Sequence, residues 1–227
     1  MMKWMMVAIA AGTFVLAACG GGSSSRTPTA GSGSTAATSR STTAACAATP
    51  ISTPVVGGNV TKKYACAPAL TIDTNKKYFA TIKMDIGDIR LELFAKDAPV
   101  TVNNFVFLAR DHYYDGVTFH RVIPSFVAQA GDPTGTGSGG PGYTIKDEVN
   151  SHQFLDGTLG MAKTSQPNSG GSQWFIDYTP QTSLNGGYTA FGQLVSGRDV
   201  LDKIAPRDPA SATQPGTKIN TIEIEEQ

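Results

Sequence analysis

The stretch FHRVIPSFVAQAGD, residues 119–132, places polar side chains on apolar, strand-like sequence. Its polar members are Arg121 and Gln129. Phe126 and Val127 supply apolar bulk beside them. In a strand that packs on a core, such polar residues would normally face solvent. A guanidinium and an amide over an aromatic-lined pocket make a poor acid–base site, but they are suited to holding a proline ring and its peptide bond.

A second stretch, GSQWFI at residues 171–176, repeats the pattern with Gln173 and Phe175. Rotation about an X-Pro bond is slow because resonance gives the C–N bond partial double-bond character, with a barrier near 20 kcal/mol. Each ~1.36 kcal/mol removed from that barrier raises the rate about tenfold. The chemistry needs a pocket for the ring and a donor aimed at the twisted amide, with no nucleophile, metal or cofactor.

These two stretches, in this order, resemble the cyclophilin family of peptidyl-prolyl cis–trans isomerases. The resemblance runs from about Tyr78 to the C-terminus. It implies isomerase activity on proline-containing polypeptide clients, without a cofactor or a metal. It also implies that Arg121 hydrogen-bonds near the prolyl amide and opposes its resonance. The rigid, always charged fork of Arg suits this role better than Lys would.

The resemblance also assigns the other site residues. Phe126 and Gln129 join Arg121 as catalytic residues. Ala162 and Lys163 match the loop that binds the residue before proline, chiefly through backbone groups. The residues implied to contact substrate are Val127, Gly137, Ala162, Lys163, Gln173, Phe175, Leu184 and Tyr188.

Several positions depart from the family pattern. Val127 stands where many relatives have Met, and Lys163 replaces a common Asn. Ser183 occupies the place of a Trp found in cyclosporin-sensitive members, and Tyr188 that of a His. These departures argue against tight cyclosporin binding but leave isomerase activity as the expectation. The alternative is a module or chaperone of the same fold that holds proline-containing peptides without turnover.

The elements that must position these residues are mainly β. Residues 79–84 and 89–94 alternate apolar and polar around a Gly-Asp pair, which is typical of a β-hairpin. Pro99 begins a helical stretch that extends to Arg110. A second helix is expected over 199–204, and further strands over 118–122, 127–130, 158–162, 173–178, 190–194 and 218–225. This pattern predicts a closed, eight-stranded antiparallel β-barrel capped by two α-helices, the architecture that the resemblance also implies.

The first residues have the layout of a bacterial secretory signal. Lys3 precedes an apolar run from Trp4 to Ala18, shorter than the roughly 20 residues of a comfortable membrane span. Small residues then lead to Cys19, as in the lipobox of lipoproteins. We expect residues 1–18 to be a lipoprotein signal peptide and a lipid on Cys19 to anchor the chain outside the cytoplasm. An uncleaved membrane anchor and an ordinary signal are the alternatives.

Three segments are expected after the signal peptide. Residues 19–45 are rich in Gly, Ser and Thr and predict a flexible linker of about 25–30 Å. Residues 46–75 predict an irregular extension, and residues 76–227 the isomerase domain. In an oxidising compartment, Cys46 and Cys66 are candidates for a disulfide that stabilises the fold by around 3 kcal/mol. Two unpaired thiols are the alternative.

Other classes of protein fit the sequence poorly. The chain has 18 basic and 18 acidic residues and no basic stripe, which argues against nucleic-acid binding. GTGSGG at 135–140 satisfies GxGxxG, but Pro141 follows at once, so no helix can begin there to meet a pyrophosphate. Neither Ser138 nor Ser172 lies in GxSxG, and the three histidines lack metal-ligand spacing. No coiled coil or long apolar face is present, so a monomer is expected.

Overall fold

The computed structural model describes residues 51–54 and 60–227, with side chains from residue 62 onward. These residues belong to the second of two compact units, Thr43–Gln227. The predicted signal peptide and linker, together with Cys19 and Cys46, lie outside the described residues. Within the described residues, no helix combines the length and the apolar character needed to cross a bilayer.

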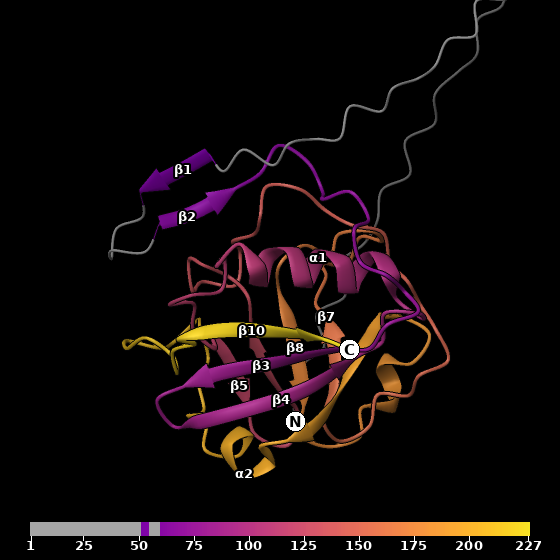
Figure 1. Ribbon diagram of the computed structural model, residues 1–227. Helices are drawn as coiled ribbons and strands as arrows, with labels where there is room; N and C mark the ends of the chain where they lie inside the picture. The colour runs from indigo at the N-terminus through magenta and orange to yellow at the C-terminus, as the bar shows by residue number, and fades with distance from the viewer. Residues whose placement is uncertain (1–50, 55–59) are drawn as a thin grey trace, which may run out of the picture. The chain divides into compact units, whose positions relative to one another are not determined.

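An eight-stranded antiparallel sheet is the scaffold of this unit (Figure 1). The order of its strands is β10 (Thr221–Glu226), β3 (Tyr78–Met84), β4 (Gly87–Leu93), β9 (Ala190–Ser196), β7 (Thr158–Met161), β8 (Trp174–Asp177), β6 (Val127–Ala130) and β5 (Arg121–Ile123). The sheet curls, and among the described residues its two edges are joined by the isolated bridge Thr118–Lys218 instead of a continuous ladder. The prediction of a mainly β, eight-stranded antiparallel fold is therefore confirmed.

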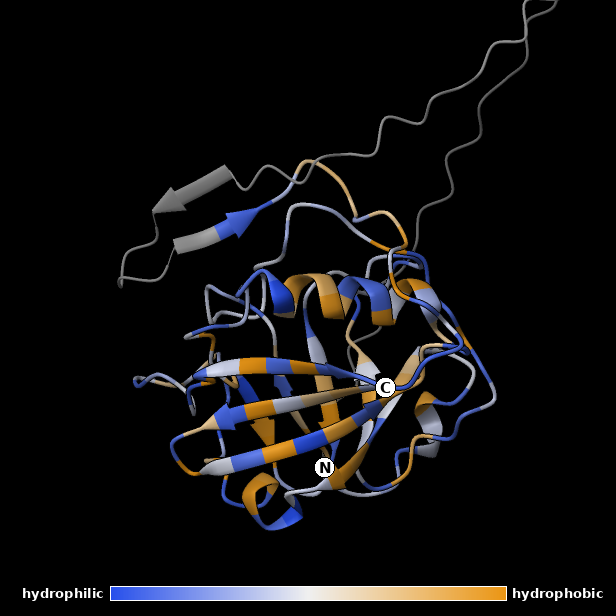
Figure 2. Ribbon diagram, in the orientation of Figure 1, coloured by the Kyte–Doolittle hydropathy of each residue, from blue (hydrophilic) through white to orange (hydrophobic). Residues whose placement is uncertain are grey.

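The hairpin of β3 and β4 follows from alternation in the sequence. Ile82 pairs with Ile89 across the two strands, and both side chains are fully buried. Gly87 has φ 124°, a conformation that a residue with a Cβ rarely adopts. A Cβ there would also lie 2.8 Å from Val200, so the turn packs tightly against the segment of the second helix. Figure 2 shows the alternation as orange and blue bands along the strands.

Two helices lie at opposite ends of the curled sheet (Figure 1). Helix α1 (Pro99–Arg110) begins at proline, which has no N–H to leave unsatisfied in the first turn. Its apolar residues Val102, Phe105 and Val106 are buried, as their spacing predicts. Helix α2 (Arg198–Leu201) is shorter than the predicted helix over 199–204, because i→i+3 hydrogen bonds tighten the chain after it. A short 3₁₀-helix, η1 (Thr182–Leu184), precedes β9.

Aromatic side chains fill the interior between the helices and the sheet. Trp174 is fully buried, and its ring lies 6.0 Å from that of Phe105 and 5.6 Å from that of Phe119. Phe175, the next residue of β8, belongs to a separate apolar cluster on the other side of the strand. Successive side chains of a strand point to opposite faces, so one strand serves both the core and the site.

The segment expected to be irregular contains two strands, β1 (Ile51–Pro54) and β2 (Val60–Lys63), which pair antiparallel. Their β-branched residues favour strand structure, and Pro54 lies at the end of β1, where it interrupts no ladder. Cys66 follows β2 and is disulfide-bonded. Its predicted partner Cys46 lies outside the described residues, so that pairing stays a prediction.

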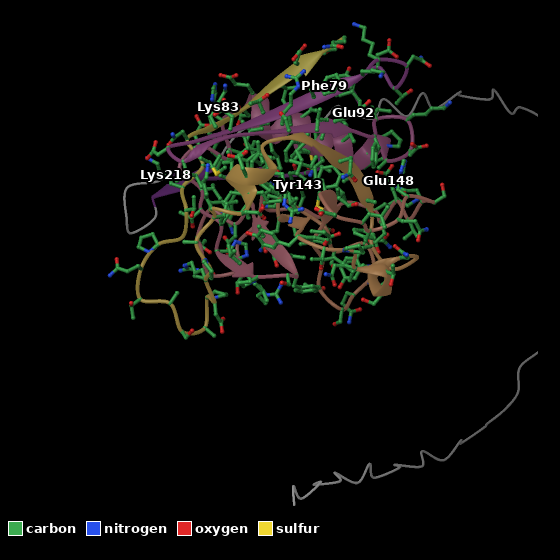
Figure 3. The ribbon with its side chains drawn as sticks, turned by 90° about the horizontal axis from the view of Figure 1, so that it is seen from below. Phe79, Lys83, Glu92, Tyr143, Glu148 and Lys218 are labelled. Atoms are coloured by element: carbon green, nitrogen blue, oxygen red, sulfur yellow. The ribbon has the colours of Figure 1, made fainter. Side chains whose placement is uncertain are left out.

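Tyr64 docks the end of this extension onto helix α1. The side chain is buried, with its ring 5.2 Å from Phe107 and 6.1 Å from Tyr143. Its hydroxyl donates a hydrogen bond of 2.6 Å to Oδ2 of Asp111 at the end of the helix. Figure 3 shows Tyr143 among packed side chains inside the unit, whereas Lys83 lies toward the outside of the sheet. Tyr64 thus packs the end of this extension against the domain of residues 76–227.

Candidate active site

Strand pairing brings the polar and apolar residues of both sequence motifs onto one face of the sheet. Arg121 on β5 is the register partner of Gln129 on β6. Gln129 is in turn the partner of Phe175 on β8. Paired residues of adjacent strands project to the same side, and so does Val127, two residues before Gln129. The sheet therefore places a guanidinium, an amide and an aromatic ring side by side.

A cavity of about 240 Å³ opens over this face. Its lining residues are Arg121, Phe126, Val127, Gln129, Ala162, Lys163, Phe175, Leu184 and Tyr188. Each of these nine was predicted from the sequence as a site residue. The other two predicted site residues, Gly137 and Gln173, line a larger adjoining cavity instead. We refer to the first cavity as the proline pocket and to the second as the adjoining cavity.

The floor of the proline pocket is apolar and includes residues that the sequence did not reveal. Val127 and Phe175 are buried there together with Phe154 and Ala190. The rings of Phe154 and Phe175 stack with centroids 5.9 Å apart. A Cβ at Gly160 would collide with the ring of Phe175, so only glycine fits beneath it. Phe154 was missed because it lies in an irregular segment without periodicity.

A chain of hydrogen bonds orients the amides beside Arg121. Arg121 Nη1 donates to Oε1 of Gln129 over a long 3.5 Å. Gln129 Nε2 donates to Oε1 of Gln173 at 2.9 Å. Gln173 Nε2 donates to the carbonyls of Gly137 at 3.0 Å and Gly139 at 2.9 Å. Carbonyl oxygens can only accept hydrogen bonds, so Gln173 must direct its Nε2 toward them and its Oε1 toward Gln129. Gln129 must in turn direct its Oε1 toward the guanidinium of Arg121.

The guanidinium of Arg121 remains available to a ligand. It lies 5.4 Å from the centroid of the Phe126 ring, a cation–π arrangement that holds it at the rim of the pocket. None of the ion pairs among the described residues involves Arg121. Its charge is therefore not satisfied by a carboxylate of the domain. It is one of the residues that line the proline pocket.

Asp132 holds the glycine-rich loop that receives Gln173. The buried carboxylate accepts hydrogen bonds from the backbone N–H groups of Thr134 at 2.7 Å and Gly137 at 2.6 Å. Burial acts to raise the pKa of Asp132, but the hydrogen bonds from Thr134, Gly139 and Gly137 lower it below the ordinary value. Asp132 ends the first motif, yet its part in shaping the loop had no signal in the sequence.

Lys163 carries a charge that the domain neutralises. Its Nζ lies 2.7 Å from Oδ2 of Asp147, and both side chains are mostly buried. The same ammonium lies 5.4 Å from the centroid of the Tyr188 ring. Burial acts to raise the pKa of Asp147, and the hydrogen bond from Lys163 lowers it below the ordinary value. Lys163 thus forms a fixed wall between the two cavities.

Comparison with known proteins agrees with this geometry. Residues 79–225 match the family described as cyclophilin type peptidyl-prolyl cis-trans isomerase/CLD. The chain belongs to this family. The cyclophilin-type domain therefore catalyses peptidyl-prolyl cis–trans isomerisation, as the sequence motifs predict.

Curated relatives carry the same activity in their names. A peptidyl-prolyl cis-trans isomerase of Synechococcus elongatus is 54% identical over 114 residues, which cover 50% of this chain and 78% of the relative. Peptidyl-prolyl cis-trans isomerase B of Bacillus subtilis is 49% identical over 126 residues, 55% of this chain and 87% of the relative. These matches cover most of each relative and about half of this cyclophilin-type chain.

A solved structure of a cyclophilin-type isomerase shares the fold. The protein of Cryptosporidium parvum, determined in the presence of the dipeptide Ala-Pro, is 35% identical with a TM-score of 0.59. The match covers 65% of this chain and 98% of that one. The cyclophilin-like architecture of the present domain, with eight strands and two helices, is thereby confirmed.

Proposed function

We propose that the proline pocket binds proline-containing polypeptides and that Arg121 is the donor that accelerates their isomerisation. The observation that carries this proposal is the guanidinium of Arg121, which forms no ion pair with the described residues, in a pocket of about 240 Å³ with an apolar floor. The structure of the Cryptosporidium parvum relative in the presence of Ala-Pro supports the class of ligand. Phe126, Val127 and Phe175 would hold the proline ring.

The physical argument concerns the prolyl nitrogen. In the planar amide its lone pair is delocalised into the carbonyl, whereas in the twisted transition state it is localised and can accept a hydrogen bond. A donor placed there stabilises the transition state more than either planar isomer. Arg121 is suited to this because Phe126 and Gln129 contact its guanidinium and the floor of the pocket beside it is apolar.

Activity of Arg121→Ala in the full chain tests the catalytic assignment. Removing one preorganised donor should lower kcat/KM about a hundredfold with little change in peptide affinity. Arg121→Lys should recover only part of the activity, since an ammonium lacks the planar fork. Arg90→Ala, which removes a half-buried arginine that pairs with Glu225 and lines neither cavity, is the matched control and should keep full activity. Equal turnover by wild type and Arg121→Ala would refute the assignment.

For localisation, we propose that the chain is a bacterial lipoprotein anchored through Cys19, which assists the folding of extracytoplasmic proteins. The apolar run that ends in Leu-Ala-Ala-Cys supports this, as does the disulfide at Cys66, because structural disulfides persist in oxidising compartments. Membrane fractionation of wild type and Cys19→Ser is the test. The variant should leave the membrane fraction, and its retention there would contradict a lipid anchor.

A further inference from the structure

We propose that Lys63, supplied by the N-terminal extension, makes the adjoining cavity selective for an acidic side chain next to the substrate proline. This inference rests on the proposed function of the proline pocket. The adjoining cavity has a volume of about 590 Å³ and shares Gln129, Ala162 and Lys163 with that pocket. A peptide whose proline occupies the first cavity can therefore extend one flank directly into the second.

The charged side chains that line the adjoining cavity are basic. Lys63 and Lys163 are the charged residues that line it, and no acidic residue is among the described residues of its wall. The ammonium of Lys163 is already paired with Asp147 at 2.7 Å. Lys63 is exposed and takes part in none of the ion pairs between described residues. One uncompensated positive charge consequently faces the cavity.

The extension holds Lys63 at this wall by contacts on either side of it. The N–H of Tyr64 donates a hydrogen bond of 2.8 Å to the carbonyl of Pro141. Gly142, with φ 97°, approaches so closely that a Cβ would lie 2.8 Å from the carbonyl oxygen of Tyr64. The ammonium of Lys62 pairs with Asp111. Lys62 contacts Asp111 at the end of α1 and Tyr64 contacts Phe107 of α1, whereas Lys63 between them lines the adjoining cavity.

The chemistry at this position selects a carboxylate. An ammonium at a partly solvated wall attracts an acidic side chain by about 0.2–1 kcal/mol, which corresponds to a preference of up to about fivefold. The attraction should weaken as salt screens it. The glycine-rich loop at residues 137–142 adds little side-chain bulk, so the cavity has room for such a side chain. Lys63 is thus a specificity-determining residue, outside the catalytic set.

The test measures kcat/KM of the full chain, purified in detergent, on proline peptides that carry Glu or Gln at successive positions on either flank. Exchange NMR follows both isomers without a coupling protease. Wild type should prefer Glu about two- to fivefold at positions on one flank, and the preference should fall toward unity at high salt. Lys63→Met should bring the ratio of kcat/KM for Glu over Gln peptides to about one, and Lys63→Glu should invert it.

Lys62→Met is the matched control, because it removes the same charge from the neighbouring residue on the side away from the cavity. It should retain the preference for Glu. A preference that survives Lys63→Met, or one that is equal on both flanks, would overturn the inference. Binding of the same peptides, followed by NMR titration, reports the preference without turnover. If the peptides were not turned over but still bound with a preference for Glu that depends on Lys63, only the proposed catalysis would be refuted.

Discussion

Gln129 donates a hydrogen bond of 2.9 Å from its amide nitrogen to the amide oxygen of Gln173. This contact links the two sequence motifs, and it connects Arg121 to the glycine-rich loop through amide groups alone. Neither glutamine can reverse its amide without losing a partner, because the acceptors at the far end are backbone carbonyls of Gly137 and Gly139.

Gln173→Ala should therefore slow isomerisation. Without its partner, the Gln129 amide is free to turn and Arg121 loses its oriented neighbour, which we expect to lower kcat/KM about tenfold, or about 1.4 kcal/mol. Exchange NMR on a short proline peptide measures the change. The exposed Gln214→Ala serves as control and should be fully active. Wild-type activity in Gln173→Ala would show that the hydrogen-bond chain plays no part in catalysis.

Asp177 should make the stability of the domain dependent on pH. Its carboxyl is fully buried, has no hydrogen-bond partner among the described residues, and burial, helped by Asp156, raises its pKa to about 8. Because the pKa is higher in the folded state, the folded domain is favoured when Asp177 is protonated. This contribution to the unfolding free energy is fully present below the unfolded pKa of 3.8 and is lost as pH rises through about 8.

The comparison of wild type with Asp177→Asn isolates this effect. Relative to the variant, wild type should lose up to about 1.4 kcal/mol of unfolding free energy per pH unit between these two pKa values. Urea titrations at a series of pH values measure it. The exposed Asp208→Asn should follow wild type at every pH. A constant difference between wild type and Asp177→Asn over this range would contradict the raised pKa.

Tyr64 should contribute to the stability of the whole domain, although it precedes the family match. Tyr64→Ala leaves a cavity between Phe107, Tyr113 and Tyr143, and we expect a loss of about 3 kcal/mol in urea unfolding. Tyr64→Phe removes only the hydrogen bond to Asp111 and should cost about 1 kcal/mol. If both variants were as stable as wild type, the extension would not be docked through Tyr64 in solution.

Ser183 should limit cyclosporin affinity. It lies exposed on η1, beside Leu184 of the proline pocket, and offers a ligand neither an aromatic face nor an indole N–H. Ser183→Trp should strengthen cyclosporin binding about tenfold, because Trp anchors contribute a large share of the energy of interfaces. Calorimetric titration measures the affinity. Tight binding by wild type, unchanged in the variant, would contradict this expectation.

Much of the site followed from local sequence. The motifs at 119–132 and 171–176 indicated Arg121, Gln129 and Phe175, and the alternation of polar and apolar residues indicated that each lay on a strand. The structure brings all three to one pocket. A short motif carries this information because the side-chain direction in a strand is determined by its period of two residues.

Other features had no local signal. Phe154 lies in an irregular segment, and its position under Phe175 depends on the absence of a side chain at Gly160. The segment 46–75 was expected to be irregular, yet β1 and β2 pair within it and Tyr64 is buried against α1. A composition rich in Pro and Gly indicates a low propensity for regular structure. It does not indicate that one aromatic residue, Tyr64, packs against a distant helix.

By itself, the sequence indicated the family, the isomerase activity and the nine residues that line the proline pocket, because its motifs resemble those of the cyclophilin family. It did not indicate Phe154 or Ala190 in the floor of that pocket. Tertiary structure alone decided that Lys63 lines the adjoining cavity, how the amides are oriented and which carboxyl is buried without a hydrogen-bond partner among the described residues. Those properties depend on contacts between segments far apart in the chain, and pattern within a segment carries no information about the charge or burial that a distant segment imposes.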